Sequence, residues 1–212
     1  MWTLFGAPGS GSAAVEIALA RCAVPYRVLR AATWEPESAL AELQRANPLG
    51  QVPTLQFDDG SVMTESAAIL IHLGLTFPAS GLLPGDAPAR AQALRGLVFI
   101  AANCYAAIGV IDYPERWFEG GSEADHERLR LGARRRLHGY WDLFADEFGS
   151  APGLAGGKPD ALAILAAVVS RWSGARAHLR QSRPAMLTSL ERVEADPDVA
   201  PVFARHWPPD RQ

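Results

Sequence analysis

The sequence has few cysteines and almost no lysine. Its 212 residues include two cysteines, Cys22 and Cys104, and one lysine, Lys158. Two cysteines exclude a disulfide framework and a cysteine-rich zinc site. Each stands in an apolar helical context, which favours an inert buried thiol. Because nearly all basic residues are arginines, the shortage of lysine is a compositional bias and not a binding signature.

Strong charge of one sign and long hydrophobic runs are also lacking. The 20 Lys and Arg residues face 23 Asp and Glu residues, and a net charge of −3 gives no reason to expect a nucleic-acid partner. The start of the chain carries no basic segment followed by an apolar run. The apolar stretch 94–111 is interrupted by Arg95 and Asn103, and stretch 161–169 is far below the ~20 residues that cross a bilayer. We therefore expect a cytoplasmic protein with no targeting segment and no membrane partner.

Residues 1–77 alternate short strand and helix patterns. Asp58-Asp59-Gly60-Ser61 between two strand patterns predicts a hairpin, and Ser12 is placed to cap the first helix. The expected order is β-α-β-α followed by β-β-α. The strands are expected at 2–5, 26–29, 52–57 and 62–63, and the helices at 13–23, 39–45 and 65–75.

Residues 88–212 carry helical patterns only, after a run of turn residues at 78–87 that predicts a linker. The helix expected at 160–176 is apolar nearly all round, which is typical of a central buried helix, and Asp160 is placed to cap it. The other helices are expected near 89–111, 123–148, 184–195 and 198–206.

The glycine-rich loop after the first strand fits phosphate-binding patterns only loosely. Gly9-Ser10-Gly11-Ser12-Ala13-Ala14 matches G-x-G-x-x-A, but no acidic residue ends the second strand. No Lys-Ser/Thr pair follows the glycines either, as a P-loop requires. Dinucleotide binding is therefore the most distant alternative, which a titration with NAD(P)H would test. The five histidines show no metal-ligand spacing, so we expect no metal.

The segment Gln51-Val52-Pro53-Thr54-Leu55 is more informative. A proline at the start of a strand removes a hydrogen-bond donor from the sheet. One physical use of such a proline is a cis peptide at Val52-Pro53, which turns the preceding backbone outward. Val52 could then offer its N–H and C=O to an extended peptide ligand, as an added strand does.

Thr64-Glu65-Ser66 opens a helix directly after a strand, eleven residues beyond Pro53. The backbone N–H groups and the Ser66 hydroxyl at a helix start would hold a carboxylate, and Glu65 could pair with an amine. Alone, these residues would be an ordinary helix start. Together with the Val-Pro strand they predict a receptor for a small zwitterion joined to an extended peptide.

These motifs resemble those of the cytosolic glutathione transferase superfamily, over essentially the whole chain. The strongest pieces are Asn47-Pro48-Leu49-Gly50-Gln51-Val52-Pro53-Thr54-Leu55 and Thr64-Glu65-Ser66-Ala67-Ala68-Ile69, supported by Gly81-Leu82-Leu83-Pro84 and Val168-Val169-Ser170-Arg171-Trp172. The resemblance implies a thioredoxin-like N-terminal domain (1–77), a linker (78–87) and an all-helical C-terminal domain (88–212). It also implies glutathione as co-substrate and a homodimer.

The resemblance assigns roles to residues of the candidate glutathione site. Val52 would pair its backbone with the cysteinyl part of glutathione, and Pro53 would be the cis-proline. Glu65 and Ser66 would hold the γ-glutamyl end, and Gln51 would help at either end of the peptide.

The resemblance also places the catalytic position in the loop after the first strand. Ser10 falls where serine-type members carry the hydroxyl that favours the thiolate, and Ser12 is the second choice. The tyrosine-type position falls on Phe5 or Gly6 and the cysteine-type position on Gly11, so those mechanisms are disfavoured. The structural alternative is that Ser10 belongs only to a flexible turn. The hypothesis predicts that Ser10→Ala leaves glutathione binding largely intact and raises the pKa of the bound thiol.

The second-substrate pocket is less well determined. Tyr105, Tyr113 and Trp117 are candidate walls, although aromatic residues at helical spacing also suit a core. One departure from the family is Ala163, which stands where the buried helix usually carries an aspartate three residues after its cap, here Asp160. The missing aspartate puts the stability or folding detail of the chain in doubt, but not glutathione binding.

The expected function is transfer of glutathione to a small, hydrophobic electrophile. Isomerisation, dehalogenation and peroxide reduction share the thiolate and differ only in the pocket, so they stay open as alternatives. A non-catalytic interaction module with the same fold is the alternative from another class.

Overall fold

The structure is a computed structural model that describes residues 1–35 and 37–208. Its N-terminal part is a four-stranded sheet with the order β2-β1-β3-β4, in which β2 is parallel and β3 antiparallel to β1. The predicted order of strands and helices is confirmed. The elements are β1 (Trp2–Gly6), α1 (Ser12–Arg21), β2 (Tyr26–Arg30), α2 (Leu40–Ala46), β3 (Thr54–Gln56), β4 (Val62–Thr64) and α3 (Ser66–Thr76).

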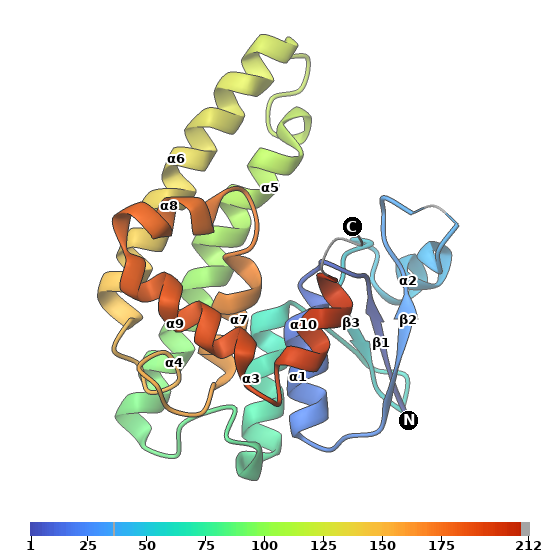
Figure 1. The fold of residues 1–212 in the computed structure, drawn as a ribbon. Coiled ribbons are helices and arrows are strands. Elements are labelled where there is room, and N and C mark those ends of the chain that lie inside the picture. Colours follow the sequence, from blue (N-terminus) through green and yellow to red (C-terminus); the bar gives the residue numbers. More distant parts are fainter. Residues whose placement is uncertain (36, 209–212) are drawn as a thin grey trace.

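The remainder of the described chain is helical, which confirms the predicted fold class of a thioredoxin-like domain followed by helices. Figure 1 shows α4 and α5 as successive parts of one helical run beside the long helix α6, and α10 returning to lie along α1. The elements are η1 (Pro78–Ser80), α4 (Ala87–Phe99), η2 (Ile100–Tyr105), α5 (Ala106–Asp112), η3 (Pro114–Arg116), α6 (Glu123–Phe148), α7 (Ala161–Val169), α8 (Ala175–Ser182), α9 (Pro184–Ala195) and α10 (Ala200–His206).

Helix α7 joins the two parts of the chain through one hydrophobic core. All of its residues are buried, and it packs on α1 and α3 as well as on α4 and α9. Leu4 and Ile17 of the N-terminal part belong to the same buried cluster as Leu97 and Leu165. Because this core is continuous, the exact domain limits at 77 and 88 stay a prediction.

The predicted helix at 160–176 is wrong in its C-terminal half. α7 ends at Val169, and Ser173 (φ 55°) and Gly174 (φ 78°) adopt left-handed backbone conformations that end a right-handed helix. A separate helix, α8, begins at Ala175. The helix expected at 89–111 is likewise interrupted by the π-helical turn Ile100–Tyr105. The strand expected at 52–57 is shorter and spans Thr54–Gln56.

The prediction that Ser12 caps α1 is also wrong. Gly11 is the N-cap residue and has no side chain that could accept a cap hydrogen bond; the N–H of Ser12 donates to Ser10 Oγ instead. Ser12 is already the first residue of the helix, so its fully buried hydroxyl lies beside the loop and not over the helix end.

Asp160 caps α7 as predicted, since its Oδ1 accepts a hydrogen bond from the Ala163 N–H at 2.9 Å. We expect Asp160→Ala to lower the free energy of unfolding by about 1–2 kcal/mol, because the Ala163 N–H would be left unpaired in a buried position. Urea denaturation measures this change. Asp86, the exposed cap of α4, offers the matched variant Asp86→Ala, for which water replaces the lost acceptor and a smaller loss is expected. Equal losses for the two variants would contradict the argument.

One helical run among the described residues, Ala87–Asp112, is long and apolar enough to cross a membrane. In the structure it packs against α6 and α7 as part of the helical core. The expected absence of a membrane segment stays a prediction.

Candidate functional site

The segment before β3 has the predicted cis peptide between Val52 and Pro53. The paired residues of β1 and β3 end at Phe5 and Thr54, which leaves the half-buried Val52 beyond the hydrogen-bonded part of the sheet. The buried side chain of Asn47 holds the segment before β3 in place. Its Nδ2 donates to the Gln51 carbonyl at 3.1 Å and to Thr54 Oγ1 at 3.0 Å. The side chain of Gln51 is exposed.

The start of α3 directly follows β4, as the sequence predicts. Glu65, the exposed N-cap residue, has φ 65° and ψ 110°, a conformation that costs energy for a residue with a side chain. Strained backbone of this kind gathers at functional sites. Ser66 follows as the first helical residue and is only 5% exposed. A carboxylate placed here would meet the free N–H groups and the positive end of the helix dipole.

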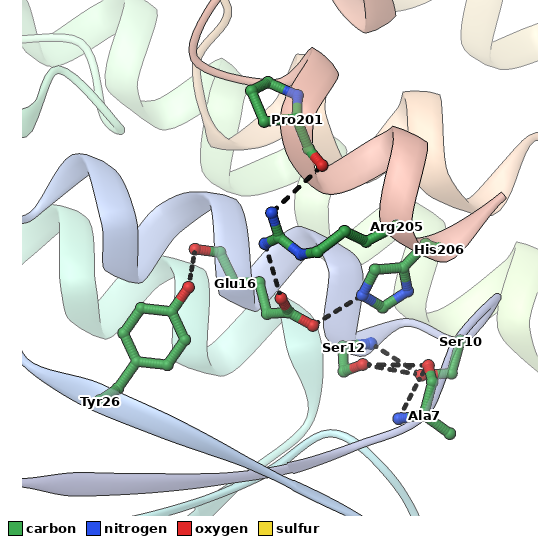
Figure 2. Close-up of polar contacts among 8 residues, drawn as sticks. All are labelled: Ala7, Ser10, Ser12, Glu16, Tyr26, Pro201, Arg205 and His206. Carbon is green, nitrogen blue, oxygen red and sulfur yellow. Dashed lines mark hydrogen bonds and ion pairs between the residues drawn. The ribbon is translucent and has the colours of Figure 1, made fainter. Parts of the chain in front are cut away.

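The loop between β1 and α1 is closed by the hydroxyl of Ser10. Ser10 Oγ donates to the Ala7 carbonyl at 2.7 Å and accepts from the Ser12 N–H at 3.2 Å. Ser10 Oγ and Ser12 Oγ lie 2.9 Å apart (Figure 2). Since each hydroxyl has a single proton, both protons have acceptors within the loop.

Gly11 is the point where the separate parts of the candidate site meet. A Cβ atom on Gly11 would lie 3.5 Å from Pro53 Cδ and 3.5 Å from Ser66 Oγ. The structure therefore brings the start of α1, the Val52-Pro53 segment and the start of α3 to one place. The same Cβ would lie 2.6 Å from the hydroxyl oxygen of Tyr105.

Tyr105 reaches this place from the helical part of the chain. Its hydroxyl lies 3.1 Å from Ser66 Oγ, and burial raises its pKa to about 12, so the hydroxyl keeps its proton at neutral pH. The indole of Trp172 lies 5.8 Å from the Tyr105 ring and donates to the Gly9 carbonyl at 3.1 Å. Sequence reasoning proposed Tyr105 as a pocket wall but missed these contacts, because they join segments far apart in the chain.

A buried charged cluster lies beside the Ser10 loop and was not predicted. Glu16, one turn after Ser12 on α1, binds His206 Nε2 at 2.6 Å and an Arg205 guanidinium nitrogen at 3.2 Å (Figure 2). Burial by itself would raise the pKa of Glu16, but hydrogen bonds and charge from His206 and Arg205 outweigh it and hold the pKa below its usual range. The cluster fixes the C-terminal helix α10 on the helix that carries the loop.

The other predicted residues are placed farther along the helical part. The Arg116 guanidinium stacks on the Tyr113 ring at 3.9 Å, and Trp117 is 62% exposed. Their role as pocket walls stays a prediction. Within residues 1–35 and 37–208, no three His, Cys, Asp or Glu side chains form a group that could hold a metal ion. Cys104 is buried, and this burial raises its pKa to about 12.

Part of this chain is similar in sequence to known proteins. The family of the glutathione S-transferase N-terminal domain matches residues 12–75, which include Val52, Pro53, Glu65 and Ser66 but not Ser10. The uncharacterized GST-like protein YncG of Escherichia coli is 38% identical over 119 residues, 55% of this chain and 57% of that protein. The maleylacetoacetate isomerase of Pseudomonas aeruginosa is 30% identical over 116 residues, 51% of this chain and 53% of that protein. The aligned region thus spans about half the length of these curated relatives.

Solved structures resemble the whole fold. A glutathione transferase homolog from Sulfitobacter, solved with bound glutathione, has a TM-score of 0.83 at 25% identity and covers 95% of this chain and 96% of its own. A glutathione transferase from Methylococcus capsulatus has a TM-score of 0.73 at 26% identity and covers 97% of this chain and 98% of its own. Residues 12–75 thus match the glutathione S-transferase N-terminal domain family, and the fold and these relatives support membership of the cytosolic glutathione transferase superfamily.

Proposed function

We propose that this chain binds glutathione and activates its thiol for transfer to a small hydrophobic electrophile. The supporting observation is the convergence of three backbone segments on Gly11, with Pro53 and Ser66 each 3.5 Å from the position of its missing Cβ. In this proposal the Val52 backbone and Pro53 hold the cysteinyl part, while Glu65, Ser66 and Gln51 hold the γ-glutamyl end. The cysteinyl sulfur then lies at the start of α1.

The start of α1 suits a thiolate for two reasons. A free thiol has a pKa near 8.5, and the positive end of a helix dipole lowers it. Hydroxyl groups that donate to sulfur favour the charged form further. In the predicted mechanism the donor is Ser10 or Ser12, and Ser10 would have to turn its proton away from the Ala7 carbonyl to serve. The thiolate forms a bond to an electrophilic carbon, and the leaving group departs with the displaced electron pair.

A second candidate is a glutathione-dependent isomerase. Its support is the similarity to the maleylacetoacetate isomerase of Pseudomonas aeruginosa. In such a reaction the thiolate would add to a carbon–carbon double bond, the resulting single bond would rotate, and elimination would return free glutathione. The same thiolate site would serve, with a pocket that binds an anionic olefin in place of an apolar electrophile.

Calorimetric titration of the full chain with glutathione tests the binding step. We expect saturable binding at millimolar glutathione or below, and no saturation by 2-mercaptoethanol, which lacks the γ-glutamyl and glycyl ends. Turnover of an aryl halide or of a cis-olefinic diacid then separates the transferase from the isomerase. A chain that binds no glutathione would contradict both functions and favour the interaction module, which gel filtration and a pull-down would then examine.

We propose a homodimer in the cytoplasm, with glutathione and a small electrophile as its ligands and neither nucleic acid nor membrane as a partner. Tyr105, Tyr113 and Trp117 are proposed as walls of the second-substrate pocket.

A further inference from the structure

Gly11 has a backbone conformation that any residue could adopt. Its φ is −62° and its ψ is −12°, in the right-handed helical region. A side chain at position 11 is therefore excluded by lack of space and not by the backbone conformation. The hydroxyl oxygen of Tyr105 stands 2.6 Å from the Cβ position of Gly11, closer than any real side chain tolerates. The tyrosine hydroxyl thus occupies the space that a side chain on the loop would fill.

The Tyr105 hydroxyl is held in this place from two sides. Tyr105 is the last residue of the π-helical turn Ile100–Tyr105, and such turns are rare and often lie at functional sites. Trp172 packs beside the tyrosine ring and also binds the carbonyl of Gly9 in the loop. Ser66 Oγ, at 3.1 Å, lies within hydrogen-bond distance of the hydroxyl.

The serine hydroxyls of the loop find their hydrogen-bond partners within the loop itself. Ser10 donates to the Ala7 carbonyl at 2.7 Å. Ser12 Oγ lies 2.9 Å from Ser10 Oγ and is fully buried beneath Gly6, whose Cβ position is 2.6 Å away. The hydroxyl of Tyr105, by contrast, comes from the helical part of the chain and stands 2.6 Å from the Cβ position of Gly11.

We propose that the Tyr105 hydroxyl is the catalytic group that donates a hydrogen bond to the glutathione sulfur, while Ser10 and Ser12 shape the loop. This inference rests on the proposed function, because it names the donor within the same site. The thiol proton leaves to solvent, the sulfur keeps the electron pair, and Tyr105 retains its own proton. The donor comes from the helical part of the chain and takes the place of a side chain on the loop.

The experiment measures the pKa of the bound glutathione thiol from its thiolate ultraviolet absorbance. Tyr105→Phe is expected to raise this pKa by about one unit, which lowers the ratio of thiolate to thiol about tenfold at any given pH. The dissociation constant for glutathione is expected to change much less than the thiolate fraction. Tyr140→Phe is the matched control, since the Tyr140 hydroxyl accepts from Arg136 on α6 and is expected to leave the thiol pKa unchanged.

A pair of variants at Gly11 makes the test independent of a general loss of structure. Gly11→Ser alone is expected to weaken turnover, because its side chain meets the Tyr105 hydroxyl. Gly11→Ser combined with Tyr105→Phe removes that oxygen and supplies a new hydroxyl on the loop. The double variant is expected to have a lower thiol pKa than Tyr105→Phe alone, so that the two effects are not additive.

The outcomes separate this inference from the proposed function. A chain that binds no glutathione in calorimetry contradicts the function itself. If glutathione binds with a lowered thiol pKa that Tyr105→Phe does not change, the inference fails and the function stands. A rise of the thiol pKa in Ser10→Ala but not in Tyr105→Phe assigns the donor to Ser10 instead. If Tyr105→Phe tightens binding without changing the thiol pKa, the hydroxyl only blocks the Ser66 subsite and the inference is wrong.

Discussion

Replacing Ser66 by alanine is expected to raise the dissociation constant for glutathione by about 10- to 100-fold. A hydrogen bond to a charged group contributes about 1.5–3 kcal/mol, and each 1.4 kcal/mol corresponds to a factor of about ten in affinity. Ser66 is 5% exposed at the first position of α3, so water reaches the bound carboxylate poorly once the hydroxyl is gone. Calorimetry on the wild type and on Ser66→Ala measures this change.

Two variants show whether the loss of affinity comes from the carboxylate contact. Ser61→Ala removes a hydroxyl that binds Asp59 in the exposed hairpin turn, and its affinity should match the wild type. Tyr105→Phe removes the partner of Ser66 but not the serine, so it should keep most of the affinity. An unchanged dissociation constant in Ser66→Ala would show that the γ-glutamyl carboxylate binds elsewhere.

Local sequence patterns predicted the cis-proline segment and the start of α3 well, because each depends on neighbouring residues. A proline before a strand and a serine after a strand end are each recognisable within a few residues, and both lie where the sequence placed them. The hairpin at Asp58–Ser61 and the cap at Asp160 follow from the same short-range chemistry. The helix break after Val169 was missed, because Trp172 and Ser173 carry no strong breaking signal before Gly174.

The contacts that complete the site could not be predicted from sequence, because they join distant segments. Tyr105 meets Ser66 across 39 positions, and His206 meets Glu16 across 190. A glutamate in an apolar helix offered one signal, since a carboxylate is almost never fully buried unless it is paired. That signal predicts a cationic partner for Glu16 but does not identify it.

Glu16→Gln is expected to lower the free energy of unfolding by about 3 kcal/mol at neutral pH, because the buried carboxylate loses its hydrogen bonds with His206 and Arg205, and a hydrogen bond to a charged group contributes about 1.5–3 kcal/mol. The side chains of Glu16 and His206 are 7% and 5% exposed, so water cannot replace the lost charge. A loss of this size should lower the melting temperature by about 6–12 °C. Calorimetry or circular dichroism on heating measures it, and Glu147→Gln is the control. Glu147 pairs with Arg95 where both side chains are about half exposed, and such pairs contribute little.

The pH dependence of this loss follows from the direction of the Glu16 pKa shift. The folded pKa lies below the unfolded value of about 4.5 because His206 and Arg205 stabilise the carboxylate. The charge of Glu16 therefore stabilises the fold fully above the unfolded pKa, and that stabilisation is lost as the pH falls through the folded pKa. The difference between wild type and Glu16→Gln should be largest near neutral pH and should shrink below about pH 4.5. A difference that stays constant down to pH 3 would show that the carboxylate acts through its shape and not through its charge. Glu16 lies one turn beyond Ser12. We therefore expect Glu16→Gln also to destabilise the loop that is proposed to hold the glutathione sulfur.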